Sequence, residues 1–320
     1  MTALLEVEGL SVILRTARGP AVALRDLSFR LEAGETLGLV GESGCGKSMT
    51  ALALMGLLPE GAAVSGSIRF RGQELAGAPE ASLAALRGNR IAMVFQEPMT
   101  SLNPLLPIGR QVAEPLVWHR GMAPREARAE ALRLLEKVGL PDPARRLDAY
   151  PHQISGGQRQ RVMIAVALAC GPDLLIADEP TTALDVTIQG QILDLIAGLV
   201  EESGMALILV SHNLGVIAES VSRVAVMYGG TIVEDGPTEA VFNRLAHPYS
   251  QGLFAALPRL DARPGDYLPT IAGTVPELAD LPPGCRFADR CTLAVADCAE
   301  VPPVVDLGQG HHARCFRVTP

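Results

Sequence analysis

The 320-residue sequence lacks an excess of positive charge. It carries 27 lysine and arginine residues against 35 aspartate and glutamate residues, which gives a formal net charge of −8. Proteins that bind nucleic acids or anionic membranes generally present a basic face. The charge balance therefore argues against both classes, and we expect no nucleic-acid partner.

A long hydrophobic run is also missing. The longest apolar stretch, at 162–171, is about half the length that a membrane-spanning helix needs. The first residues include Glu6 and Glu8 and show no basic segment before an apolar one, so they do not resemble a signal peptide. We expect the chain not to cross a bilayer by itself, and any membrane role to depend on partners.

Apolar residues nevertheless make up 48% of the chain, enough for a large core. The segments 174–179 and 206–210 are almost wholly apolar, which is typical of strands buried on both faces of a parallel sheet. The pattern at 187–201 predicts the helix that connects them. Residues 1–35 indicate short alternating strands, and residues 97–157 indicate a mainly helical section.

A glycine-rich segment, GESGCGKS, matches the G-x-x-x-x-G-K-[ST] pattern of a phosphate-binding loop. A strand is predicted before it at 36–40, and a helix after it at 48–58. The glycines would let backbone N–H groups face nucleotide phosphates, Lys47 would contact the phosphates, and the Ser48 hydroxyl would ligate Mg²⁺. Cys45 fits as a small residue, and its place beside a helix N-terminus would make it an alkylation target. The candidate nucleotide-binding residues here are Gly41, Glu42, Ser43, Gly44, Cys45, Gly46, Lys47 and Ser48.

Two further segments fit the same chemistry. Asp178 and Glu179 end the apolar segment at 174–179, where Asp178 would hold Mg²⁺ and Glu179 would deprotonate the attacking water. Upstream, Ser155, Gly156 and Gly157 form an SGGQ turn before an apolar helix, a second place where a helix N-terminus favours phosphate.

Together these segments resemble the phosphate loop, signature motif and Walker B strand of ATP-binding cassette (ABC) proteins. The resemblance implies an α/β P-loop NTPase fold with a parallel-sheet core, an antiparallel β subdomain and a helical subdomain at about 97–157. It also implies that Gln96 touches Mg²⁺ and the water, and that His212 contacts the γ-phosphate. Two cassettes would form a head-to-tail dimer, in which the following residues reach the nucleotide or the interface of the opposing subunit: Ser155, Gly156, Gly157, Gln158 and Asp185.

Three departures from the ABC pattern stand out. Ile154 replaces the usual leucine at the start of the signature, and Asn213 follows His212 where many relatives have an acid. No aromatic residue precedes Phe29, so the positions near Leu14 and Ala21 offer no ring on which adenine could stack. We expect weaker nucleotide affinity or looser base selectivity.

Segments outside the ATP motifs resemble a narrower group. QEPMTSLNPLLPIGRQVAEPL after Gln96, HPYSQGLFAALPRLD at 247–261 and GCRFADRC at 284–291 are similar to the ATP-binding subunits of bacterial dipeptide/oligopeptide importers. This resemblance implies a peripheral ATPase on the cytoplasmic face of the inner membrane. Its partners would be a second ABC subunit, by family custom a paralogue, two membrane permease subunits and, indirectly, an extracytoplasmic peptide-binding protein.

Other functions stay open at this point. The same machinery could import a nickel chelate, glutathione or a sugar, because cargo contacts lie in other subunits. A soluble ABC ATPase of DNA repair or translation is a second class, but those proteins usually carry two cassettes, a coiled coil or a zinc insertion, which this sequence does not show. Intact Lys47, Asp178, Glu179 and His212 argue against a catalytically silent subunit.

The tail contains a group of cysteines. We divide the chain into an ATP-binding domain at 1–246 and a C-terminal region at 247–320, whose four cysteines are separated by five, six and sixteen residues. This spacing matches neither a zinc ribbon nor a ferredoxin. The family resemblance favours a [4Fe–4S] cluster, while zinc, with His311 and His312 nearby, and free thiols stay open. The candidate ligands are Cys285, Cys291, Cys298 and Cys315.

Overall fold

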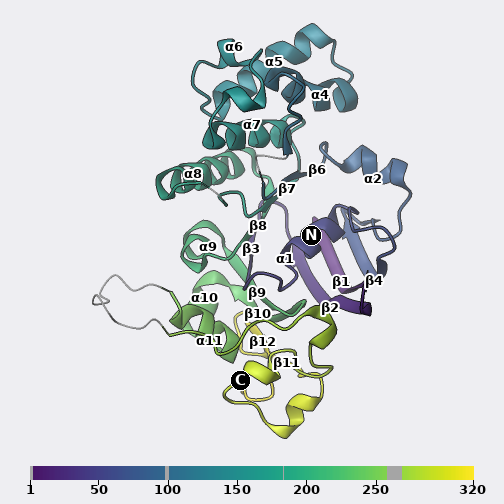
Figure 1. The fold of residues 1–320 in the computed structure, drawn as a ribbon, viewed down its shortest axis with the longest axis vertical. Helices are drawn as coiled ribbons and strands as arrows, with labels where there is room; N and C mark the ends of the chain where they lie inside the picture. The colour runs from purple at the N-terminus through teal and green to yellow at the C-terminus, as the bar shows by residue number, and fades with distance from the viewer. Residues whose placement is uncertain (1–2, 98–100, 183, 258–268) are drawn as a thin grey trace. The chain divides into compact units, whose positions relative to one another are not determined.

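The computed structural model describes residues 3–97, 101–182, 184–257 and 269–320. These residues divide into two units (Figure 1). One unit comprises residues 1–32, 36–77 and 211–320, and the other comprises 33–35 and 78–210. Parts of two segments quoted above (98–100 and 258–261) lie outside the described residues.

An antiparallel sheet in the first unit has the strand order β2-β1-β4-β5. Its strands are β1 (Leu5–Thr16), β2 (Gly19–Leu31), β4 (Ala63–Phe70) and β5 (Gln73–Glu74). The prediction of short strands at 1–35 is wrong, since β1 and β2 have 12 and 13 residues and form one long hairpin. The β1–β2 register shifts three times between Val7 and Ile13. Each shift interrupts the alternation of side chains while pairing continues, so the sequence pattern looks broken where the strands are not.

A second sheet in this unit holds the strand that precedes the phosphate loop. Strand β3 pairs in parallel with β9, β10 joins β9 antiparallel, and the tail strands β12 and β11 extend the edge beyond β10. The strands are β3 (Thr36–Val40), β9 (Arg223–Tyr228), β10 (Thr231–Pro237), β11 (Val304–Asp306) and β12 (His312–Arg314). The C-terminal residues thus share a sheet with β3 (Figure 1).

Short helices complete the first unit. They are α1 (Lys47–Leu54), α9 (Leu214–Ser220), α10 (Thr238–Asn243), α11 (Pro248–Ala255), η2 (Leu278–Asp280), η3 (Ala288–Arg290) and η4 (Ala296–Ala299). Helix α1 ends four residues before the predicted end at 58. Gly56 adopts φ 61°, its N–H bonds to Ala53 O, and the N–H of Leu57 bonds to Leu52 O, which is the Schellman pattern that closes a helix. The glycine therefore stops the helix before Pro59 can.

The second unit contains the parallel strands expected from the apolar segments. Strands β6 (Ile91–Val94), β7 (Leu174–Asp178) and β8 (Ala206–Ser211) pair in parallel in the order β6-β7-β8. Every residue of β6 and β7 is buried, and α8 (Val186–Ser203) connects β7 to β8. The prediction of a buried parallel sheet with a connecting helix is confirmed.

Helices make up most of the rest of this unit. They are α2 (Glu80–Leu86), α4 (Ile108–Arg120), α5 (Pro124–Lys137), α6 (Pro143–Arg146), η1 (Pro151–Gln153) and α7 (Gly156–Leu168). Figure 1 shows α4, α5, α6 and α7 gathered into one group. Ala127, Ala131 and Leu135 form the buried face of α5, as their spacing predicts. Within the described ranges, no helix is both long and apolar enough to cross a bilayer.

Candidate functional site

The phosphate loop runs from β3 into α1 and depends on two glycines with left-handed backbones. Gly41 has φ 149° and Gly46 has φ 103°. A Cβ on Gly41 would lie 2.3 Å from the carbonyl oxygen of Met227, and one on Gly46 would lie 2.9 Å from a methyl group of Leu24. The path of the loop therefore requires both glycines.

Lys47 lies at the first position of α1 with its ammonium folded back over the loop. Its Nζ donates to the carbonyl oxygens of Gly41, at 2.8 Å, and Glu42, at 3.0 Å, and the residue is buried. The ammonium and the N-terminal N–H groups of α1 both favour an anion at this end of the loop. This half of the site can hold phosphate.

Two loop residues have surroundings that the sequence did not indicate. The Glu42 carboxylate forms an ion pair with Arg290 of the tail at 2.7 Å, and its backbone N–H donates to Oη of Tyr249 at 2.8 Å. Alkylation of Cys45 is not favoured, since the residue is fully buried and burial raises the pKa of its thiol. Sequence reasoning missed Arg290 and Tyr249, although both lie in segments that carry the importer resemblance.

The two adjacent acids lie at the end of β7 in the second unit. Asp178 is buried, and Glu179 follows with φ 44°, a conformation that non-glycine residues seldom adopt. The Glu179 Oε2 accepts hydrogen bonds from Gln96 Nε2 at 3.1 Å and from Thr182 Oγ1 at 2.9 Å. The structure thus brings together Gln96 and Glu179, as their predicted roles require. It adds Thr182, which lies three residues after Glu179 and which no sequence motif singled out.

The SGGQ turn forms the predicted helix N-terminus at α7. Ser155 Oγ accepts from the N–H of Gln158 at 3.4 Å, and Gln158 Oε1 accepts from the N–H of Ser155 at 3.2 Å. This reciprocal pair is a capping box. A Cβ on Gly157 would lie 2.9 Å from a methyl group of Ile188, so the turn packs closely against α8. Ile154, the departure from leucine, is buried beneath the turn.

Asp185 and Asn213 both cap helices. Asp185 Oδ1 accepts from the N–H of Ile188 at 3.0 Å at the start of α8. Asn213 Oδ1 accepts from the N–H groups of Gly215, at 3.0 Å, and Val216. The amide at 213 therefore fills a structural position that an acid could also fill. His212, directly before it, is exposed at the end of β8.

The aliphatic positions noted near the first strands face each other in the hairpin. Leu14 pairs with Ala21 across β1 and β2. Neither side chain offers a ring, so the expectation of weaker adenine stacking stays a prediction.

The tail cysteines lie in the first unit and are close enough to affect one another's ionisation. Cys285 and Cys315 are buried, and Cys291 and Cys298 are partly exposed. Burial, with a smaller contribution from the other three thiols, raises the pKa of Cys285 to about 11. The N–H of Leu293 donates to Cys291 Sγ at 3.4 Å. Among the described residues, however, no three Cys, His, Asp or Glu side chains are arranged to hold a metal ion.

The two tail histidines have partners of their own. His311 is buried, and its Nε2 lies 2.8 Å from Glu234 Oε1. The same carboxylate also accepts the N–H groups of Ala246 and His247. His312 lies 3.8 Å from Asp235. The Glu234 contact ties His311 to β10, away from a zinc-ligand role.

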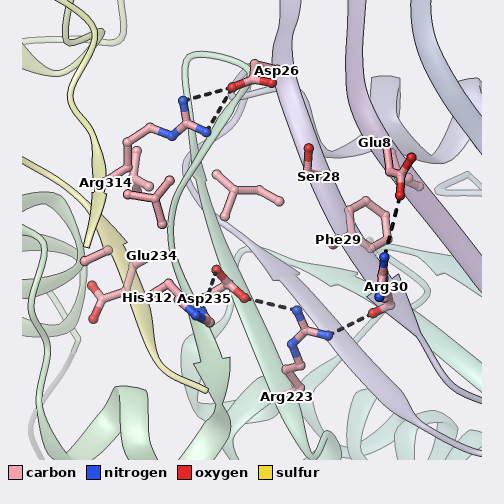
Figure 2. A pocket seen from close by; sticks show the side chains of 15 residues that line it. Glu8, Asp26, Ser28, Phe29, Arg30, Arg223, Glu234, Asp235, His312 and Arg314 are labelled. Atoms are coloured by element: carbon pink, nitrogen blue, oxygen red, sulfur yellow. Dashed lines mark hydrogen bonds and ion pairs between the residues drawn. The ribbon is translucent and has the colours of Figure 1, made fainter. Parts of the chain in front are cut away.

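A cavity of about 550 Å³ lies in the first unit, away from the phosphate loop. The described residues that line it belong to or border strands β1, β2, β9, β10, β11 and β12. Figure 2 shows charged residues of the cavity in pairs, with Arg314 of the tail reaching Asp26 of β2. The ion pairs drawn there are Arg223–Asp235, Arg314–Asp26 and Arg30–Glu8. A ligand would have to displace these pairs. We therefore interpret the cavity as part of the packing between the tail strands and the antiparallel sheet.

Comparison with known families gives two matches. The model of the family "ABC transporter" matches residues 24–182, and the model of "Oligopeptide/dipeptide transporter, C-terminal region" matches residues 233–298. Together they include the phosphate loop, the signature turn, the two acids and three of the four tail cysteines.

Curated relatives and solved structures agree with these matches. A protein of Brucella abortus (strain 2308), named as a peptide import ATP-binding protein, is 53% identical over 98% of this chain and 97% of its own length. One of Brucella ovis with the same descriptive name is 52% identical with the same coverage. A dimeric post-hydrolysis structure of an ATP-binding cassette bound to ADP and Pi has a TM-score of 0.66 and 29% identity, covering 73% of this chain and 98% of that one. An ABC transporter subunit of Clostridium perfringens has a TM-score of 0.64 and 26% identity, covering 77% and 92%.

Proposed function

The chain belongs to the ABC transporter family, as its motifs predicted, and from this premise we propose that it is the ATP-hydrolysing subunit of a bacterial importer of dipeptides or oligopeptides. The observation that carries the cargo class is the match of residues 233–298 to the oligopeptide/dipeptide transporter C-terminal region. Full-length relatives named for peptide import support it. The glycine-dependent loop and the buried Lys47 support the ATPase activity.

The catalytic roles follow from the chemistry of each side chain. Glu179 is the general base that deprotonates the attacking water, and Gln96, in hydrogen-bond contact with it, orients its carboxylate. Lys47 neutralises charge on the phosphates, and His212 contacts the γ-phosphate. Magnesium, when bound, would neutralise further phosphate charge, with Ser48, Gln96 and Asp178 as the residues that hold it.

Hydrolysis requires a second cassette in this proposal. The turn formed by Ser155, Gly156, Gly157 and Gln158 presents a capped helix N-terminus to the nucleotide of the opposing subunit, and Asp185 lies at the interface. The dimeric cassettes among the structural relatives support this arrangement. We infer that the partner is a paralogous subunit. The pair would bind two permease subunits at the cytoplasmic face of the inner membrane, fed by an extracytoplasmic peptide-binding protein.

Vesicles reconstituted with this chain, its partner cassette and the permease subunits test the cargo. With ATP inside and a peptide-loaded binding protein outside, we expect uptake of a labelled dipeptide or tripeptide. A complex carrying Glu179→Gln is the matched control and should take up neither the dipeptide nor the tripeptide. Uptake of a nickel chelate, glutathione or a sugar in place of peptides would overturn the cargo assignment while leaving the ATPase in place.

For the tail we propose a small cysteine-containing region at 247–320 that holds a [4Fe–4S] cluster. The donor set supports it, because four thiolates are the usual ligands of such a cluster. Sulfur atoms that accept backbone N–H groups, as those of Cys291 and Cys315 do, are a further feature that tunes such centres. The side chains as they lie do not form a finished metal site in the described residues, so binding would require them to move together.

Metal analysis of protein purified without oxygen decides this point. We expect about four irons and four sulfides per chain with a broad visible absorption band. Cys291→Ser should lower the iron content. Cys170→Ser should not, because Cys170 is a buried cysteine of the second unit. Zinc alone, or metal-free folded protein, would contradict the cluster.

A further inference from the structure

Arg290 makes an unusually complete set of contacts for a residue in an irregular tail. Its guanidinium forms a two-pronged pair with the Glu42 carboxylate, at 2.7 Å and 3.0 Å. It also donates to the backbone carbonyls of Ala272, at 2.9 Å, Gly273, at 3.3 Å, and Ile271, at 3.4 Å. Only 5% of its side chain is exposed. A planar donor fork satisfied in this way is held in one orientation, which a lysine could not reproduce.

The partner of Arg290 is the second residue of the phosphate loop. The backbone of Glu42 is held from two further directions, since its N–H donates to Tyr249 Oη and its carbonyl accepts Lys47 Nζ. Tyr249 is fully buried in α11, so its hydroxyl is a fixed acceptor. The C-terminal region therefore contacts the same residue that helps to position the phosphate-binding lysine.

The ion pair between Arg290 and Glu42 affects the charge that a bound nucleotide meets. The Glu42 carboxylate is an acid inside a loop whose chemistry is to bind phosphate, and like charges repel more strongly where water is partly excluded. Arg290 neutralises this acid and turns it toward the tail. Without the guanidinium, the charge would oppose the phosphates and the loop would lose one anchor.

We propose that Arg290 is a positioning residue for the phosphate loop, through which the C-terminal region sets the affinity of the site for nucleoside triphosphates. The proposal rests on the ATPase function proposed above and is independent of what the cysteines bind. It assigns the region 247–320 a role at the ATP site itself, in addition to any role of its cysteines.

Equilibrium binding of ATP and AMP to the full-length chain tests the proposal. Arg290→Met leaves the Glu42 carboxylate without its partner in a largely buried ion pair. We therefore expect ATP binding to weaken about tenfold. AMP binding should weaken less, because Glu42 lies in the loop that faces the β- and γ-phosphates. In the assembled complex the KM for ATP should rise by a similar factor, with kcat changed less than about twofold.

Two further variants separate charge from folding. Combining Glu42→Gln with Arg290→Met removes both charges and should restore ATP affinity to within about threefold of the wild type. Arg314→Met is the matched control, since Arg314 also joins the tail to the first strands, through Asp26 at 3.1 Å, and its contacts among the described residues do not include the phosphate loop. Its ATP affinity should equal that of the wild type.

The outcomes are distinct. ATP affinity unchanged in Arg290→Met, or an equal loss in the variant with both charges removed, would overturn the positioning role. If Arg290→Met does not fold, Arg290→Lys, which keeps the charge without the fork, should still show an intermediate loss of affinity, and wild-type affinity there would also overturn it. Failure of the wild-type chain to bind ATP would instead overturn the proposed function.

Discussion

Glu179 adopts a backbone conformation that glutamate seldom adopts, and it does so beside a buried acid. Its φ of 44° costs about 1–3 kcal/mol of backbone strain, so the surrounding structure must stabilise this conformation. Here the N–H of Glu179 bonds to Val210 O at 3.0 Å, and Gln96 and Thr182 hold its carboxylate. Backbone strain maintained at one residue by three partners supports a chemical role for that residue.

Replacing Glu179 with glutamine tests this role. Glu179→Gln keeps the shape but removes the base, so phosphate release from ATP should fall by about 10²- to 10⁴-fold. ATP should still bind and drive dimerisation, which size-exclusion chromatography with ATP would show. Glu80→Gln, at an exposed acid of the same unit, is the control and should hydrolyse ATP normally. Normal turnover by Glu179→Gln would remove it as the base.

Residues within motifs were the ones that sequence reasoning could find. The loop, the acids and the signature turn have fixed spacing, so local patterns alone predict Lys47, Glu179 and Ser155 as site residues. The pair between Glu42 and Arg290 joins residues 248 positions apart, and a salt bridge at that separation leaves no local pattern. Such contacts depend on the tertiary fold and had to be seen in the structure.

At the scale of elements, helix α11 begins at a buried histidine. The side chain of His247 accepts the N–H of Tyr249 at 3.0 Å, which requires Nδ1 to be unprotonated. Burial lowers the pKa of His247 from 6.5 to about 3. The helix that carries Tyr249 to the phosphate loop therefore starts from a neutral imidazole.

This histidine predicts a pH dependence of stability. Below pH 6.5 the unfolded chain binds a proton that the folded chain excludes until about pH 3, so the free energy of unfolding falls as pH falls through this window. Through this group, the free energy of unfolding should be about 1.4 kcal/mol lower at pH 5.5 than at pH 7.5. Urea unfolding at both pH values measures this loss of free energy of unfolding. The loss should be smaller in His247→Asn than in the wild type, because asparagine can cap the helix but cannot titrate. An identical drop in both proteins would contradict this account.

The elements themselves were predicted with uneven success. Apolar runs identified β7 and β8 and the helix between them, because burial on both faces leaves a clear pattern. The hairpin of β1 and β2 was predicted as shorter pieces, since its bulges interrupt alternation. The last turn predicted for α1 was wrong because Gly56 closes the helix first. Both errors come from local changes of backbone geometry that hydrophobicity does not reveal.

At the scale of the whole molecule, the sequence indicated a separate C-terminal region from residue 247 but not how that region pairs with the rest of the fold. Strand β12 pairs with β10 through Glu234 and Asp235, so the tail continues a sheet of the nucleotide-binding unit. A three-residue strand in a proline-rich segment has too little pattern to predict. The boundary at 247 stays a prediction, because the matched C-terminal family region begins at residue 233.

The measurement that tests the central claim most directly is ATP hydrolysis by the reconstituted four-subunit complex, with and without a peptide-loaded binding protein. We predict that peptide stimulates phosphate release by the wild-type complex, and that Glu179→Gln in this chain lowers both the basal and the stimulated rates. A wild-type complex that binds ATP but hydrolyses it at a rate indifferent to every peptide would contradict the assignment of this chain to peptide import.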